Sequence, residues 1–457
     1  MKKFISILLS AFLLIASIAL FSGCRSVSTA GDNERTVIIS EEDIERELKW
    51  FLGIEKDGDV GNMGNRTYTS ESERHAAEKL YELIAEGGYE HLTVAPLDST
   101  EFEVTITTAA TLNNPATQVK RKSQNVEIKF GGGTSGKQII IGTGYGNNYG
   151  NYDAKFDETN PGASTGAFDN ATGVATVLAI MKHFELNAQQ IRDKIDFDVT
   201  FVFFGCSEYN SLGASSYAEK MKPIDRLNTA AMFNISKLGG ERAYIYANDY
   251  KTERGEFLFS KAKSGGYEFY DIPDNMPIIE AEYIQGVSYT HYAMLGDHAV
   301  FSEWGINSVA IRSGYYGGFN LSDLEKSGEK NIAGTSADTY ANLIKTRAGY
   351  SKQCSDAASL IVSAVTSDGF IDAMSAADTD YSFWLQPLWA HLILLGVIVL
   401  LGVLTVVLVK VFEKKYPFVP KTKKMKIAVF GPEYESKNED EIIIDVKPKD
   451  NNNPFDI

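Results

Sequence analysis

The sequence predicts an α/β fold, a three-layer sandwich with helices on both faces of a mixed, largely parallel central sheet. Residues 197–204 form an almost continuous run of β-branched and aromatic residues, as in a strand that is buried on both faces. Residues 170–184 carry apolar residues three and four positions apart, which indicates a helix with one buried stripe. Strands that alternate with helices in this way favour a sheet with parallel crossovers.

The other elements follow from the same periodicities. Residues 41–52 have apolar positions at helical spacing. Ser70 is expected to cap a second helix that runs to about residue 85, since Glu73 follows three residues later. Alternating or apolar runs predict strands at residues 104–108, 126–130, 138–141, 230–235, 243–246 and 308–312, and helices within residues 342–365.

The N-terminus has the pattern of a bacterial export signal. Lys2 and Lys3 precede an apolar run over residues 4–21, and Ser22-Gly23-Cys24 follows. This order is typical of a secretory signal peptide. The last residues resemble a lipobox, so Cys24 is the expected lipidation site. Ordinary cleavage after Ala30 and a retained N-terminal helix are the alternatives.

Residues 388–409 are expected to form one C-terminal transmembrane helix. These 22 residues contain a single titratable group, His391. Such a segment is long enough for a bilayer core of about 30 Å at about 1.5 Å per residue. Seven lysines lie between Lys410 and Lys426, so the positive-inside rule places the C-terminus in the cytoplasm. These lysines also favour anionic lipid headgroups.

We therefore expect a single-pass protein of a bacterial cell membrane, with its main domain outside. The net charge of -16 argues against a nucleic-acid partner. If Cys24 is lipidated, Cys206 and Cys354 remain, and the sequence leaves open whether they form a disulfide. The predicted division is a lipoprotein-type signal peptide (1–24), a linker with an N-terminal helix (25–62), the α/β ectodomain (63–370), a juxtamembrane segment (371–387), the transmembrane helix (388–409) and a basic, then disordered, tail (410–457).

Six short segments occur in a characteristic order. They are residues 139–146 (Ile-Ile-Ile-Gly-Thr-Gly-Tyr-Gly), 166–173 (Gly-Ala-Phe-Asp-Asn-Ala-Thr-Gly), 203–208 (Phe-Phe-Gly-Cys-Ser-Glu), 234–239 (Asn-Ile-Ser-Lys-Leu-Gly), 295–301 (Leu-Gly-Asp-His-Ala-Val-Phe) and 334–339 (Gly-Thr-Ser-Ala-Asp-Thr). From about residue 65 to 365 the chain resembles the co-catalytic zinc aminopeptidases, metallopeptidase family twenty-eight. That family also includes non-catalytic ectodomains, such as those of the transferrin receptor and nicastrin.

The resemblance assigns five metal-ligand positions, and this chain keeps two of them. Asp169 matches the aspartate that bridges two zinc ions, and Glu208 matches a second ligand. The other three positions hold Gly144, Ser236 and Gly334, none of which supplies the family's ligand. None of the six histidines falls in a ligand position. A catalytic zinc needs about three protein ligands, so we expect no cofactor.

The general-base position of the family is also changed. It holds Ser207, whose hydroxyl cannot take a proton from water near neutral pH. A new nucleophile at Cys206 or Ser207 is not favoured, because neither has the glycine two residues later that a nucleophile elbow requires.

Asp169 and Glu208 are expected to converge and to repel each other, with the pKa of one raised. A proton, a calcium ion or a basic side chain would relieve this repulsion. Lys237 is near in sequence, but strand alternation places it on the face opposite Ser236, so it is not the favoured partner. Alternatively, Asp169 simply caps the helix that follows it.

A binding cleft is expected to be lined by Tyr145, Asp297 and His298. The resemblance places Asp297 and His298 in the frame around the site and outside the metal shell. The tyrosine-rich loop 145–153, with Tyr315 and Tyr316, either lines the same cleft or packs as ordinary loop.

The sequence therefore predicts a membrane-anchored peptidase-like domain that has lost catalysis. It would act by binding a peptide, an envelope component or a membrane-protein partner. The alternative is a metal-dependent aminopeptidase or amide hydrolase with a rearranged zinc site. A structural envelope protein is a third class, and it leaves the motifs unexplained.

Overall fold

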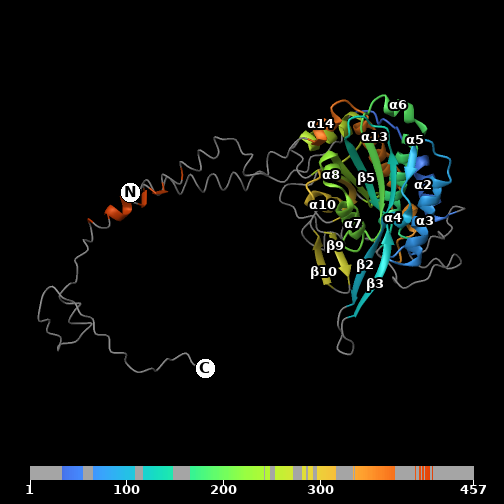
Figure 1. The fold of residues 1–457 in the computed structure, drawn as a ribbon, viewed down its shortest axis with the longest axis horizontal. Helices are drawn as coiled ribbons and strands as arrows, with labels where there is room; N and C mark the ends of the chain where they lie inside the picture. The colour runs from blue at the N-terminus through green and yellow to red at the C-terminus, as the bar shows by residue number, and fades with distance from the viewer. Residues whose placement is uncertain are drawn as a thin grey trace, which may run out of the picture. The chain divides into compact units, whose positions relative to one another are not determined.

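Figure 1 shows the computed structural model of the chain. The structure describes residues 33–54, 65–108, 117–147, 165–240, 242–247, 253–270, 280–284, 287–291, 296–314, 333 and 335–375, and in the C-terminal part residues 397, 401–402, 404–405, 407–411 and 414.

A seven-stranded mixed sheet forms the centre of the domain. Its order is β1-β4-β6-β5-β7-β11-β8. The four inner strands β6, β5, β7 and β11 run parallel, and the strands outside them pair antiparallel. This confirms the predicted α/β class and mixed sheet. The strands are β1 (Leu92–Val94), β4 (Val126–Phe130), β5 (Gln138–Gly144), β6 (Asp198–Phe204), β7 (Thr229–Ser236), β8 (Arg242–Ala247) and β11 (Ser308–Gly314).

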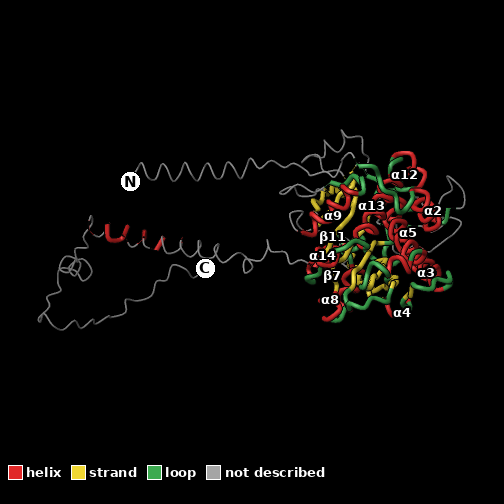
Figure 2. The backbone as a smooth tube through the Cα atoms, turned by 90° about the horizontal axis from the view of Figure 1, so that it is seen from above, coloured by secondary structure: helices red, strands yellow, loops and turns green. Residues whose placement is uncertain are grey.

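Helices cover both faces of this sheet, as Figures 1 and 2 show. On one face α5 (Thr172–Leu186) packs against α2 (Glu41–Leu52) and α13 (Tyr350–Val365). On the other face lie α7 (Leu212–Lys220) and α10 (Asp297–Glu303). Ile139 and Ile141 belong to the first core and Ile140 to the second, so β5 is buried on both faces. The domain is thus built in three layers.

The remaining elements lie at the margins of these layers. β2 (Glu101–Thr108) pairs with β3 (Thr117–Gln124) in a separate hairpin that projects from the domain in Figure 1, so residues 104–108 do not belong to the main sheet. β9 (Glu280–Ile284) and β10 (Val287–His291) form a second hairpin. The other helices are α3 (Glu71–Ala85), α4 (Leu97–Thr100), α6 (Ala188–Arg192), α8 (Pro223–Asn228), α9 (Glu253–Ser264), α12 (Tyr340–Thr346), α14 (Phe370–Ser375) and the π-helical turn η1 (Ala167–Ala171).

The domain extends beyond the predicted boundaries at both ends. Helix α2, which we placed ahead of the domain, buries Leu48 and Phe51 in the main core. At the other end α14 buries Met374, which we placed in the juxtamembrane segment. Cys206 and Cys354 are both buried and free, so the disulfide left open by the sequence is not formed.

The C-terminal residues 378–457 form a separate unit. Among the residues that the structure describes, no helix is long and apolar enough to cross a membrane. The expected span 388–409 lies largely outside those residues. The part of it that is described, residues 397, 401–402, 404–405 and 407–409, is helical. Cys24 and the signal segment also lie outside the described residues.

Candidate functional site

The predicted site residues meet at the carboxyl ends of the parallel strands. Gly144 ends β5 and Ser236 ends β7. The side chain of Asn170 joins these ends: its amide NH₂ donates to Thr143 Oγ1 and to the carbonyl of Gly144, both at 2.8 Å, and its Oδ1 accepts the N–H of Lys237, just after β7, at 2.7 Å. Carboxyl ends of parallel strands are where ligands bind in α/β proteins.

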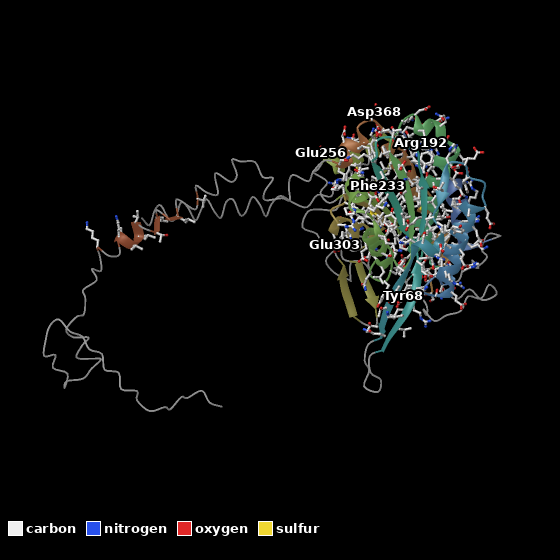
Figure 3. All side chains as sticks on the ribbon, viewed as in Figure 1. Tyr68, Arg192, Phe233, Glu256, Glu303 and Asp368 are labelled. Atoms are coloured by element: carbon white, nitrogen blue, oxygen red, sulfur yellow. The ribbon has the colours of Figure 1, made fainter. Side chains whose placement is uncertain are left out.

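Figure 3 labels residues at both ends of the domain. Tyr68 lies toward the end with the site, where its ring stacks on Tyr209 at 4.7 Å between centroids. Arg192 lies at the opposite end, where it donates to the carbonyl of Phe197 just before β6 at 2.9 Å.

Ser207 fills the space beside Gly144. A Cβ atom added at Gly144 would lie 2.5 Å from Ser207 Cβ and 2.6 Å from Ser207 Oγ. The Ser207 hydroxyl donates to Asp297 Oδ2 at 2.7 Å. A side chain at position 144 therefore fits only if Ser207 moves, because the residue in the general-base position occupies that volume.

Asp169 is buried, at 2 % exposure, in the turn η1 that precedes α5. The carboxylate of Asp338 orients this turn: its oxygens accept the N–H groups of Phe168 at 2.7 Å and of Asp169 at 3.0 Å. Burial and the nearby Asp169 raise the pKa of Asp338 to about 7. Asp169 does not cap α5, whose N-cap residue is Ala171, so that alternative is wrong.

Lys237 forms an ion pair with Asp169, with 3.0 Å between Lys237 Nζ and Asp169 Oδ2. The expectation that strand alternation would turn this lysine away is wrong. Strand β7 ends at Ser236, and Lys237 has a left-handed backbone with φ of 48°. The alternation rule no longer holds once the chain leaves the strand.

Glu208 lies beside Gly146 and close enough to Asp169 for their charges to interact. A Cβ atom at Gly146 would be 2.6 Å from Glu208 Oε2, and this oxygen makes no hydrogen bond within the described structure. Burial, and then the charge of Asp169, raises the pKa of Glu208 to about 8. The predicted repulsion between these two carboxylates is thus present, and Glu208 holds the raised pKa.

Arg66 is a site residue that the motifs did not indicate. Its guanidinium is fully buried and donates to the carbonyls of Tyr145 at 2.8 Å, Thr165 at 2.7 Å and Gly166 at 3.2 Å. Burial lowers its pKa to about 10, and the charges of Glu208, Asp338 and Asp169 oppose that shift. Arg66 lies in the loop just before the helix capped by Ser70. A single arginine in a loop forms no sequence motif, so the sequence did not indicate that it belongs to the site.

Glu73 supports the turn that carries Ser207 and Glu208. Its carboxylate accepts the N–H groups of Cys206 at 2.7 Å and Thr69 at 2.6 Å, and the hydroxyl of Ser123 at 3.0 Å. Burial raises its pKa to about 7. Burial and Glu73 also raise the pKa of the Cys206 thiol, which keeps that thiol protonated and agrees with its exclusion as a nucleophile.

The predicted cleft wall is buried in this structure. Tyr145 is fully buried, and its hydroxyl donates to the Gln124 carbonyl at 2.8 Å, so its ring faces the protein interior and the prediction for it is wrong. Asp297 and His298 are 2 % and 6 % exposed. Burial raises the pKa of Asp297 to about 6. Gly334, Tyr315, Tyr316 and loop residues 148–153 lie outside the described residues.

The residues present do not fit a pair of zinc ions. Position 144 has no room for a ligand side chain, and Asp169 already faces an ammonium group. No group of three or more His, Cys, Asp or Glu residues is arranged to hold a metal within the part of the chain that the structure describes. We therefore derive no chemistry through zinc.

Residues 147–359 match Peptidase family M28. The family resemblance predicted from the sequence is thus confirmed. No curated protein matches the chain.

Among solved structures, similar ones include three bacterial peptidases. The aminopeptidase from Aneurinibacillus sp. strain AM-1 is 14 % identical with a TM-score of 0.47, over 72 % of this chain and 93 % of that one. The zinc aminopeptidase of Bacillus subtilis is 12 % identical with a TM-score of 0.49, over 72 % and 96 %. A Zn-dependent exopeptidase from Parabacteroides distasonis is 14 % identical with a TM-score of 0.46, over 72 % and 98 %.

Proposed function

We propose that this chain is a membrane-anchored, extracytoplasmic M28-like domain that binds a ligand without hydrolysing it. The ligand classes are a peptide, a component of the cell envelope or a membrane-protein partner. The proposal covers three properties: loss of catalysis, binding at the former active site and attachment to the membrane.

The position of Ser207 is the main observation in favour of a loss of catalysis. Ser207 stands where the family places its general base, and its hydroxyl donates to Asp297 at 2.7 Å. A hydroxyl in this arrangement cannot activate water near neutral pH. The same side chain fills the space beside Gly144 where a metal ligand would begin.

Unpartnered polar atoms support a binding role. Within the described structure, neither the side-chain nitrogen nor the side-chain oxygen of Asn147 makes a hydrogen bond. The same holds for three further oxygens: Asn234 Oδ1, Glu208 Oε2 and Asp297 Oδ1. Asn147, Asn234 and Asp297 are at most 4 % exposed. Buried polar groups are normally satisfied, so this concentration at one site favours a ligand or ordered water with several hydrogen-bonding groups.

Sequence alone supports the membrane attachment. The apolar segment 388–409 with its lysine flank favours a single span with the C-terminus in the cytoplasm, and Cys24 favours a lipid at the N-terminus. Metabolic labelling with a palmitate analogue tests the lipid, with Cys24→Ser as the control. Protease digestion of intact cells tests the topology: the tail beyond Lys410 should be protected.

The function is tested by metal content and turnover. Full-length protein in detergent is equilibrated with excess zinc, desalted and measured by elemental mass spectrometry. Aminopeptidase activity is then followed on a library of free-N-terminus peptides. We expect zinc well below one per chain and no turnover above the Asp169→Asn/Glu208→Gln variant, which controls for contaminating peptidases.

The alternative is an active metallopeptidase with a rearranged site. The family match and the retained Asp169 and Glu208 favour it. Stoichiometric zinc together with turnover that the double variant abolishes would establish this alternative and overturn our proposal.

A further inference from the structure

The backbone at Lys237 is held in an unusual conformation. Its φ of 48° is left-handed, which few residues other than glycine adopt. Neighbours hold it on both sides: the Lys237 N–H donates to Asn170 Oδ1 at 2.7 Å, and the Lys237 carbonyl accepts the N–H of Ser313 at 3.2 Å as well as the Ser313 hydroxyl. An outlier that surrounding groups hold in place is a reason to look for a role of the residue.

This conformation directs the lysine side chain back over the end of the sheet. Its ammonium group lies 3.0 Å from Asp169 Oδ2. The lysine side chain is 20 % exposed and the aspartate side chain 2 %. The pair therefore joins a buried carboxylate to a cation that still touches solvent.

Asp169 needs a counter-charge in this position. The carboxylate of Asp338 accepts the backbone N–H of Asp169, and the Asp169 side chain is itself buried, at 2 % exposure. The Arg66 guanidinium is turned toward three carbonyl groups. An ionised carboxylate in such surroundings is stable only when it is paired.

We propose that the Lys237 ammonium takes the place of a metal ion against Asp169, so that the site keeps its geometry without any bound metal. This inference deepens the proposed function and rests on it. Asp169 matches the bridging metal ligand of the family. Lys237 is the residue just after Ser236, which stands where the family has another metal ligand. One side chain thus supplies a positive charge where the resemblance implies zinc ions.

The test removes the charge and offers a metal in its place. Wild-type full-length protein should show the same melting temperature in EDTA as in 1 mM calcium or zinc chloride. Lys237→Met should melt about 5 °C lower in EDTA. It should regain at least half of that loss when either cation is added, because Asp169 and Glu208 are then free to bind it.

Two variants separate this role from that of an ordinary salt bridge. Lys182 pairs with the buried Glu47 at 2.6 Å, with side-chain exposures of 23 % and 0 %, close to those of Lys237 and Asp169. Lys182→Met should lose stability without any response to cations. Lys237→Arg keeps the charge and should remain insensitive to metal.

If Lys237→Met does not express, a variant that lacks both charges takes its place in the test. Asp169→Asn/Lys237→Met should melt above either single variant and should not respond to cations. The inference is overturned if Lys237→Met shows no more cation response than Lys182→Met, or if the double variant is no more stable than the single ones. Zinc uptake with peptide turnover by the wild type is a different outcome, and that one overturns the proposed function.

Discussion

Adding a single methyl group at Gly144 tests whether the first metal-ligand position is closed. In Gly144→Ala the new Cβ would lie 2.5 Å from Ser207 Cβ and 3.7 Å from Asp297 Oδ2. Real Cβ atoms do not approach this closely, so Ser207 must move. Its movement breaks the 2.7 Å hydrogen bond to Asp297, a buried residue whose other oxygen already makes no hydrogen bond in the described structure.

The expected cost is worked from these two effects. Overpacking a filled interior costs about 1–3 kcal/mol, and loss of a hydrogen bond to a buried carboxylate costs about 1.5–3 kcal/mol. Because the two effects overlap, we expect a net loss of about 3 kcal/mol. For a domain of this size that corresponds to a melting temperature about 4 °C lower.

The assay is equilibrium unfolding in urea, together with thermal unfolding by circular dichroism. Gly349→Ala is the matched control, because a Cβ at Gly349 meets no atom within 4 Å. Ser207→Gly removes the obstacle, so Gly144→Ala/Ser207→Gly should cost about 2 kcal/mol less than the sum of the single variants. Additive behaviour, or a Gly144→Ala protein as stable as the Gly349→Ala control, would refute the idea that Ser207 closes this position.

Two further predictions concern buried charges around the site. Arg66→Met should destabilise the protein by about 3–5 kcal/mol in urea unfolding, because three carbonyl groups and the nearby carboxylates lose their buried cation; a loss below about 1 kcal/mol would contradict this role. The pKa of Glu73 is about 7 in the folded protein against an ordinary value of 4.5, so the folded state binds the extra proton and stability should fall as pH rises from about 4.5 to about 7. Glu73→Gln should remove part of that fall between pH 5 and pH 8, whereas Glu71→Gln, at an exposed position two residues earlier, should leave it unchanged.

The sequence alone determined the fold class and the family resemblance. The run at residues 197–204 supplies four residues to the first core and two, Val202 and Phe204, to the second, so its burial on both faces could be predicted without coordinates. The six motifs indicated that Asp169 and Glu208 converge, and the charge of Asp169 adds to burial in raising the pKa of Glu208. These features depend on residue type and order, which the sequence contains directly.

Only the tertiary structure decided how the altered site is held together. Strand periodicity predicted the wrong direction for Lys237, because the rule applies only while the chain remains extended. The closed space beside Gly144 depends on Ser207, 63 positions later in the chain. Arg66 joins the site through carbonyl groups at positions 145, 165 and 166. Every residue has a backbone carbonyl, so no residue type marks the carbonyl groups that Arg66 contacts. Packing distances between remote segments likewise leave no pattern in the sequence. For these reasons the contacts of Arg66 and the closed space beside Gly144 could not be predicted.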